Sequence, residues 1–250
     1  MKPKTYQAGF YNLCSRARDR ESRLRQADKI AYVLTALGSC PLSSATCLDV
    51  GCSSGIITTA IASLFARTIG LDYDDTALKH IDRSGPDVPN FLRGDAMCLP
   101  VADGSIDVII CAQVYEHVPD DESLVAEMFR VLKPGGIVFF SGPNKLFPIE
   151  PHYFLPFLHW LPGRLADGYL RVLGRGNHYY ERSRTLWGLR RLTAQFVVRD
   201  VSIDVLRNVR LAASGFRAKV LRRVPSSAWQ MLLPVFPNYN WILVKPDETE

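Results

Sequence analysis

The stretch Cys47-Leu-Asp-Val-Gly-Cys-Ser-Ser-Gly55 decides the fold. It continues a short apolar run, residues 46–50, which is typical of a strand covered on both faces. Gly51 and Gly55 follow, and the lack of a Cβ lets a ligand approach the backbone closely. A helix is predicted at 56–66, directly after this turn. The stretch therefore predicts a buried strand, a ligand-binding turn and a helix whose N-terminus suits an anionic group.

Strands and helices alternate on both sides of this turn, which is typical of a parallel sheet with helices on both faces. The alternation is lost after residue 142 and resumes with a helix at 185–196. We expect an α/β domain whose mostly parallel, seven-stranded sheet has strands at 46–50, 67–72, 90–94, 106–112, 137–141, 197–203 and 240–244. Besides the helix at 185–196, helices are predicted at 11–37, 56–66, 74–82 and 120–132.

Three carboxylates stand at the ends of the first three predicted strands. Asp49 lies just before the glycine turn, where it can accept a hydrogen bond from a cationic amine. Asp72 comes 21 residues after Gly51, and an acidic residue at about this distance typically binds ribose hydroxyls. Asp95 follows the third strand and can accept a hydrogen bond from an adenine amine. These carboxylates predict a ligand with amine, ribose and adenine groups.

A nicotinamide dinucleotide is disfavoured as that ligand. Its fingerprint reads G-x-G-x-x-G, with the glycines packing closely against the pyrophosphate. When the fingerprint is aligned from Gly51, Ser53 and Ile56 occupy the later glycine positions. A turn that accepts both a carboxylate and an ammonium group favours an amino acid over a pyrophosphate.

Taken together, these motifs resemble the class I S-adenosylmethionine-dependent methyltransferases, in the group that includes ubiquinone and menaquinone biosynthesis methyltransferases. The resemblance covers residues 45–145 well and the rest weakly. It implies a Rossmann-like fold with S-adenosyl-L-methionine as the cofactor. The motifs that carry it are LDVGCSSG (48–55), GLD (70–72), GDAMCLPVADGSIDVI (94–109), EHVPD (116–120) and RVLKPGGIVFFSGPN (130–144), in the family's order and spacing.

The resemblance also implies individual roles in the cofactor site. Asp72 would bind the ribose, Asp95 and Ala96 would contact the adenine, and Gln113 would lie near the sulfonium. Ser53 departs from the family, which usually has glycine there. The methionine end would be lined by Asp49, Gly51 and Gly55.

Residues outside the motifs complete one methyltransferase domain of 250 residues. We interpret 1–44 as an N-terminal helical cap, 45–145 as the cofactor-binding core, 146–184 as an inserted lid and 185–250 as the C-terminal part of the sheet. Residues 151–230 carry 13 Arg and one Lys against four acidic residues, or +10, which leaves −5 for the rest of the chain. This basic, aromatic region favours a small-molecule or lipid-like acceptor with anionic character over nucleic acid, although a solvated surface would show the same composition.

Three histidines are candidates for a general base, which is needed only when the acceptor must lose a proton. His117 follows the fourth strand, where the active sites of open α/β sheets gather. His152 follows the fifth strand and opens the aromatic insertion, and His178 lies near the end of the insertion. His117 also has a structural interpretation, as part of a loop-to-helix transition common in the family. No Cys or His pairs stand at zinc spacing, so no metal site is predicted.

Methyl transfer is an in-line displacement, for which the enzyme mainly aligns the acceptor and excludes water. The sequence leaves open whether the acceptor atom is O, N or C. It also leaves the oligomeric state open, and the alternative of a catalytically silent, Rossmann-like binding or scaffold protein. The first ten residues have no apolar run, and no stretch reaches the roughly 18 apolar residues of a membrane span. We therefore expect a cytoplasmic protein that is either free or peripherally bound to a membrane.

Overall fold

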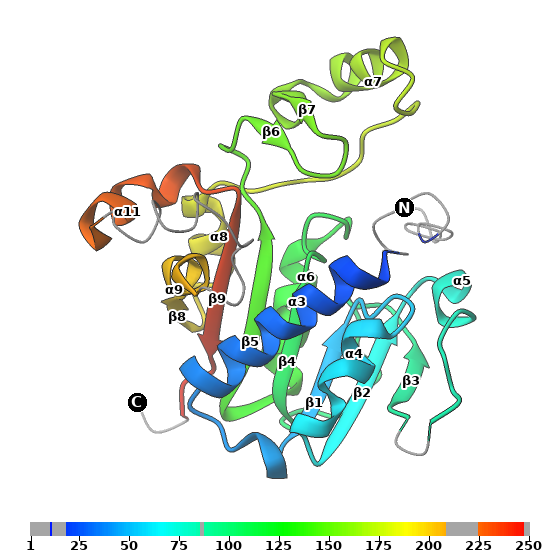
Figure 1. The fold of residues 1–250 in the computed structure, drawn as a ribbon, viewed down its shortest axis with the longest axis vertical. Coiled ribbons are helices and arrows are strands. Elements are labelled where there is room, and N and C mark those ends of the chain that lie inside the picture. The colour runs from blue at the N-terminus through cyan, green and yellow to red at the C-terminus, as the bar shows by residue number, and fades with distance from the viewer. Residues whose placement is uncertain (1–10, 12–18, 86–87, 209–224, 248–250) are drawn as a thin grey trace.

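The central element of the computed structural model is a seven-stranded sheet (Figure 1). The structure describes residues 11, 19–85, 88–208 and 225–247. The strand order is β3-β2-β1-β4-β5-β9-β8; the first five strands are parallel, and β9 runs antiparallel to both of its neighbours. The mostly parallel, Rossmann-like sheet is thus confirmed. Its strands are β1 (Thr46–Val50), β2 (Arg67–Asp72), β3 (Asn90–Arg93), β4 (Ile106–Ala112), β5 (Leu132–Pro143), β8 (Val197–Asp200) and β9 (Asn238–Val244).

Helices cover both faces of the sheet, because successive side chains of its inner strands point to opposite sides. In β4, Val108 and Ile110 pack against α3 (Arg20–Tyr32) and α4 (Ile56–Ile61). Ile109 and Cys111 belong to the opposite cluster, which holds α6 (Asp121–Val131) and α8 (Leu186–Leu192). The remaining α-helices of the described residues are α5 (Asp75–Leu78), α7 (Gly163–Val172), α9 (Ser202–Arg207) and α11 (Ser226–Leu232). No described helix has the length and apolar character that crossing a membrane requires.

Some predicted boundaries were wrong. The strand predicted at 197–203 ends at Asp200, whose carboxylate accepts the backbone N–H of Ser202 as α9 begins. The fifth strand begins at Leu132 rather than at residue 137, because its pairing with β4 continues through an irregular register. The helix predicted at 56–66 is α-helical only to Ile61 and continues as a 3₁₀ turn. Part of the helix predicted at 11–37, residues 12–18, lies outside the described residues.

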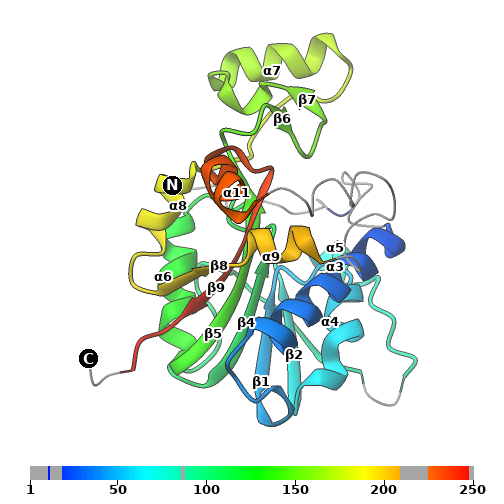
Figure 2. The ribbon, with the colours of Figure 1, turned by 60° about the vertical axis from the view of Figure 1, so that its left-hand side comes forward.

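Residues 146–184 form a small subdomain that projects beyond the end of β5 (Figures 1 and 2). It contains a hairpin of β6 (Ile149–Glu150) and β7 (Leu155–Pro156), the helix α7 and a small apolar cluster of its own. The two ends of the subdomain meet, because the N–H of Lys145 donates to the carbonyl of Arg184 at 3.0 Å. The segment therefore leaves and re-enters the domain at one place, beside the carboxyl end of the sheet.

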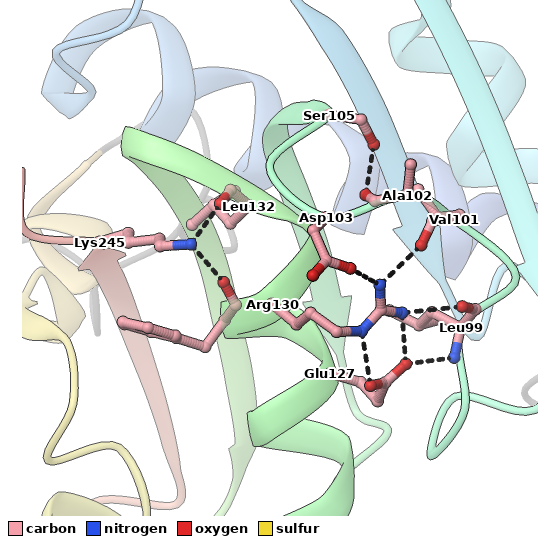
Figure 3. Close-up of polar contacts among 10 residues, drawn as sticks. Leu99, Val101, Ala102, Asp103, Ser105, Glu127, Arg130, Leu132 and Lys245 are labelled. Carbon is pink, nitrogen blue, oxygen red and sulfur yellow. Dashed lines mark hydrogen bonds and ion pairs between the residues drawn. The ribbon is translucent and has the colours of Figure 1, made fainter. Parts of the chain in front are cut away.

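Arg130 fixes the loop between β3 and β4 to helix α6 (Figure 3). Its guanidinium donates to the carbonyls of Leu99 and Val101, both at 2.9 Å, and to the carboxylates of Glu127 and Asp103. Glu127 also accepts the N–H of Leu99 at 2.7 Å. A planar guanidinium with five donors suits such a junction. The arrangement holds the loop that begins at Gly94, directly after β3.

Candidate active site

A cavity of about 550 Å³ opens at the carboxyl ends of the parallel strands. Ligands of open α/β sheets bind at this edge, and the volume is typical of small-molecule sites. Of the eight predicted cofactor-binding residues, five line the cavity: Gly51, Ser53, Asp72, Ala96 and Gln113. Asp49, Gly55 and Asp95 are not among its lining residues.

The turn after β1 brings the backbone to the edge of the cavity. Gly51 has a φ of +74°, and a Cβ on it would lie 2.6 Å from Cγ2 of Val114. Its N–H donates to the carbonyl of Leu71 at 2.8 Å, which fixes the turn to β2. Gly55, with a φ of +72°, caps α4, and a Cβ there would meet the ring of Phe91 at 2.7 Å. Both glycines are therefore required by conformation and by space.

Asp72 links this turn to the end of β2. Its carboxylate accepts the N–H of Ser53 at 2.6 Å and the N–H of Asp74 at 2.8 Å. Burial raises the pKa of Asp72, and these two hydrogen bonds act against the rise. Ser53 has a φ of +53°, a left-handed conformation that favours glycine. The usual glycine of the family therefore has a conformational reason, and this chain retains the same turn with serine.

The other two predicted carboxylates also have partners within the protein. Asp49 is 4% exposed and accepts the hydroxyl of Thr58 at 2.6 Å. Burial raises the pKa of Asp49 to about 7. Asp95 accepts the N–H of Met97 at 2.9 Å, while its neighbour Ala96 reaches the cavity. The contacts predicted for Asp49 and Asp95 with an amine and an adenine stay predictions.

Helix α3 supplies cavity residues that the sequence motifs did not indicate. Arg23, Gln26 and Lys29 line the cavity together with Asp19 and Ser22. Their spacing of three to four residues places them on one face of the helix. Burial lowers the pKa of Lys29 to about 8. This polar stripe, alternating with the apolar positions of the helix, was the available sequence signal.

Two of the three candidate histidines meet at the cavity wall. His117 and His152 both line the cavity, and their ring centroids are 4.8 Å apart. His178 is not a lining residue; its Nδ1 lies 3.0 Å from Asp167 within the subdomain, and its side chain is 68% exposed. The structure thus brings together His117 and His152, which are 35 residues apart in the sequence.

Buried carboxylates surround these imidazoles. Glu116 and Glu150 are fully buried, and Glu181 is 5% exposed. The Nδ1 of His152 lies 2.7 Å from the carboxylate of Glu150. Burial raises the pKa of Glu116 to about 7 and holds that of His117 well below its usual range. For His152, burial acts downward, but the Glu150 hydrogen bond and the nearby carboxylates leave its pKa raised.

Comparison with known proteins agrees with this architecture. Residues 48–140 match a family model described as a methyltransferase domain. A probable S-adenosylmethionine-dependent methyltransferase of Mycolicibacterium smegmatis is 40% identical over 99 residues, which is 40% of this chain and 38% of the relative. A ubiquinone biosynthesis O-methyltransferase of Thiobacillus denitrificans is 37% identical over 144 residues, or 56% and 58% of the two chains. The chain therefore matches less than two thirds of either relative's length.

Solved structures extend the likeness in fold to most of the chain. An S-adenosylmethionine-dependent methyltransferase of Mesorhizobium loti superposes with a TM-score of 0.56 at 17% identity, covering 87% of this chain and 99% of that one. The [4+2]-cyclase SpnF superposes with a TM-score of 0.55 at 17% identity, covering 89% and 80%. At such identities the likeness concerns the fold alone. The motifs of the core, their positions around the cavity and the match of residues 48–140 together identify this part of the chain as a methyltransferase domain, similar to those of the class I S-adenosylmethionine-dependent methyltransferases.

Proposed function

We propose that this protein transfers the methyl group of S-adenosylmethionine to a hydroxyl oxygen of a small, amphiphilic acceptor. The observation that carries the proposal is the composition of one cavity. One side is formed by the Gly51 turn and Asp72, and another by the imidazoles of His117 and His152. A nucleoside-binding edge and proton-handling side chains therefore share one space.

The residues present fit the cofactor. Each oxygen of Asp72 accepts one backbone N–H, and a carboxylate has about four acceptor sites, so capacity remains for ribose hydroxyls. Arg23 and Lys29 reach the same cavity and supply positive charge for the carboxylate of an amino acid. Ala96 and Leu71 offer apolar contact to a base. When bound, S-adenosylmethionine supplies a methyl group already activated by its positive sulfur.

The chain's own residues would align the acceptor and keep water away. Val114 and Val118 contribute apolar surface beside His117. The acceptor hydroxyl would lie at the cluster that His117 and His152 form with the buried glutamates around them. The nitrogen and oxygen atoms of this cluster are suited to binding an O–H group. Gln113 lines the same cavity and has a φ of +60°, and its N–H donates to the carbonyl of Ser141. Such fixed positions are the main source of rate in a displacement reaction.

The relatives and the subdomain support the choice of acceptor. The Thiobacillus denitrificans relative is named for O-methylation in ubiquinone biosynthesis. The subdomain whose Pro151 and His152 line the cavity exposes large apolar side chains, among them Phe154, Phe157 and Leu165. A quinol or other phenol with an apolar tail would have its hydroxyl at the cluster and its tail toward this surface.

The test begins with binding. Titration calorimetry should give micromolar affinity for S-adenosylmethionine and S-adenosylhomocysteine and no response to NADH. Release of S-adenosylhomocysteine should then be measured with a catechol that carries a short prenyl tail, with the untailed catechol and with an aliphatic amine as comparisons. The tailed catechol should react fastest. Absence of cofactor binding at millimolar concentration would refute the proposal and favour a scaffold role.

The same surface supports delivery of the acceptor from a membrane. Arg164, Arg171 and Arg175 are exposed on the same subdomain as these apolar side chains. Apolar and cationic groups together favour binding to anionic lipid headgroups. The protein should co-sediment with phosphatidylglycerol-containing vesicles more than with pure phosphatidylcholine. Leu165→Glu should weaken this, whereas Trp187→Glu, at a 60% exposed residue on α8, should not. Equal effects of the two variants would contradict a specific surface.

A further inference from the structure

We infer that Glu116, His117 and His152 bind a divalent first-row transition-metal ion at the wall of the cavity, where it positions the acceptor hydroxyl. The metal site follows from the geometry and charge of these side chains. Its part in catalysis rests on the proposed function.

The potential ligand atoms converge. Oε1 of Glu116 lies 3.9 Å from Nε2 of His117 and 3.8 Å from Nε2 of His152. One ligand atom from each residue falls within 4.8 Å of the others. Tetrahedral ligands at about 2.1 Å from a metal are roughly 3.4 Å apart. The two distances to Glu116 exceed this by 0.4 to 0.5 Å, and the widest separation allowed within the group, 4.8 Å, exceeds it by 1.4 Å, so side-chain shifts of up to about 1 Å would close the site. Two imidazoles and one carboxylate suit Zn²⁺, Mn²⁺ or Fe²⁺ and leave open positions for further ligands.

The second ring nitrogen of His152 is already committed. Its Nδ1 lies 2.7 Å from Oε1 of Glu150, and Oε2 of Glu150 accepts the N–H groups of His152 and Tyr153 at 2.8 and 2.7 Å. A carboxylate that accepts from one nitrogen of an imidazole orients the other nitrogen toward a metal. Glu150 would thus act as a positioning residue for His152.

The cluster also holds three buried carboxylates and two imidazoles, of which His152 is paired with Glu150. Glu116 is fully buried, and no other residue in the described part of the chain donates a hydrogen bond to either of its carboxylate oxygens. Glu150 and Glu181 add two more buried carboxylates. Across the described part of the chain, no Lys or Arg forms an ion pair with any of these three residues. Because unpaired buried charge is costly, a bound cation would stabilise this arrangement.

The ion would act on the acceptor oxygen. Coordination lowers the pKa of a hydroxyl, so its O–H bond breaks and the proton passes to solvent water. The oxygen then forms its bond to the methyl carbon, while the carbon–sulfur bond breaks and its electron pair stays on sulfur. The products are the methyl ether, S-adenosylhomocysteine and a proton. The metal keeps its oxidation state throughout.

The experiment uses Co²⁺ as a spectroscopic probe on the purified protein of 250 residues. Wild type, stripped with a chelator, should bind one Co²⁺ with visible d–d absorption, and Zn²⁺ should displace it. Glu116→Gln and His152→Gln should abolish the signal, and Glu150→Gln should weaken binding by about 10- to 100-fold. The control is His178→Gln, which removes a histidine–carboxylate pair of the same subdomain outside the cavity; Co²⁺ binding should be unchanged.

Binding of S-adenosylhomocysteine is measured on the same samples. If it binds and the chelated enzyme methylates the tailed catechol at the wild-type rate, the catalytic part of the inference is overturned while the proposed function stands. If S-adenosylhomocysteine does not bind, the proposed function fails, and Co²⁺ binding still decides the metal site. Failure of Co²⁺ and Zn²⁺ to bind, or unchanged binding in folded Glu116→Gln, would overturn the site itself.

Discussion

Asp72→Asn should separate the structural role of this side chain from its role in cofactor binding. In the carboxylate, one oxygen accepts the N–H of Ser53 and the other that of Asp74. An Asn side chain has one acceptor oxygen and an NH₂ group, so one of these N–H groups loses its partner. An unpaired buried N–H costs about 1–3 kcal/mol. Asp72 lines the cavity, where water can replace the partner, so we expect about 1 kcal/mol, or roughly 2–4 °C in Tm.

The effect of Asp72→Asn on cofactor affinity should be larger. Hydrogen bonds to a charged group contribute about 1.5–3 kcal/mol, so loss of one to the ribose predicts roughly 10- to 150-fold weaker binding of S-adenosylhomocysteine. Calorimetry with the 2′-deoxy and 3′-deoxy analogues of S-adenosylhomocysteine tests whether a lost hydrogen bond to the ribose is the cause. Removing a ribose hydroxyl should then weaken binding less in the variant than in the wild type. The control is Asp75→Asn, whose exposed carboxylate pairs with Lys79 on the next turn. Unchanged affinity in folded Asp72→Asn would refute a ribose role for this residue.

Three further substitutions test the frame of the site. Ser53→Gly should raise stability by about 1 kcal/mol, seen as a higher Tm, because a left-handed φ of +53° strains serine; a lower Tm would contradict this. Asp49 has a folded pKa of about 7 against an ordinary 3.8, so its stabilising contribution is complete below pH 4 and is lost as pH rises to 7. Asp49→Asn should therefore reduce the fall in the free energy of unfolding between those pH values, as measured by urea unfolding. An unchanged dependence of this free energy on pH would contradict the raised pKa of the buried carboxyl. Arg130→Lys should cost about 1–2 kcal/mol and speed hydrogen exchange at residues 99–103, because an ammonium does not span the contacts in Figure 3; unchanged exchange would contradict the role assigned to Arg130.

Features governed by local periodicity were predictable from the sequence. The buried runs of β1 and β4 were located to the residue, because a parallel strand covered on both faces is continuously apolar. The error at residues 201–203 arose where β-branched residues continue beyond the strand, while the Asp200 carboxylate already accepts the N–H of Ser202, the first residue of α9. Propensity there favoured a strand, and a side-chain hydrogen bond to the backbone ended it.

Roles that depend on contacts between distant segments were less accessible. For Asp49 the sequence predicted a contact with an amine, which stays a prediction, but it did not indicate the hydrogen bond that Asp49 accepts from Thr58 of α4. The lining residues of α3 belong to no motif, and only the packing of that helix across the sheet reveals their place. In both cases the chemistry of the residue was visible in the sequence, whereas the direction of its side chain was set by tertiary packing.

The histidine cluster shows what topology adds to such a prediction. His117 follows β4 and His152 follows β5, and these strands are parallel neighbours whose carboxyl ends lie at the same edge. Groups that leave adjacent strand ends converge whatever their separation in the sequence. Weighed one at a time, the histidines were three competing candidates for a single base. When the order of the strands is taken into account, two of these histidines belong to one site, and each is next to or paired with a buried glutamate. His178 follows neither of the two strands. A search for metal ligands in this fold should therefore compare residues after neighbouring strands, because sequence spacing alone misses the pair.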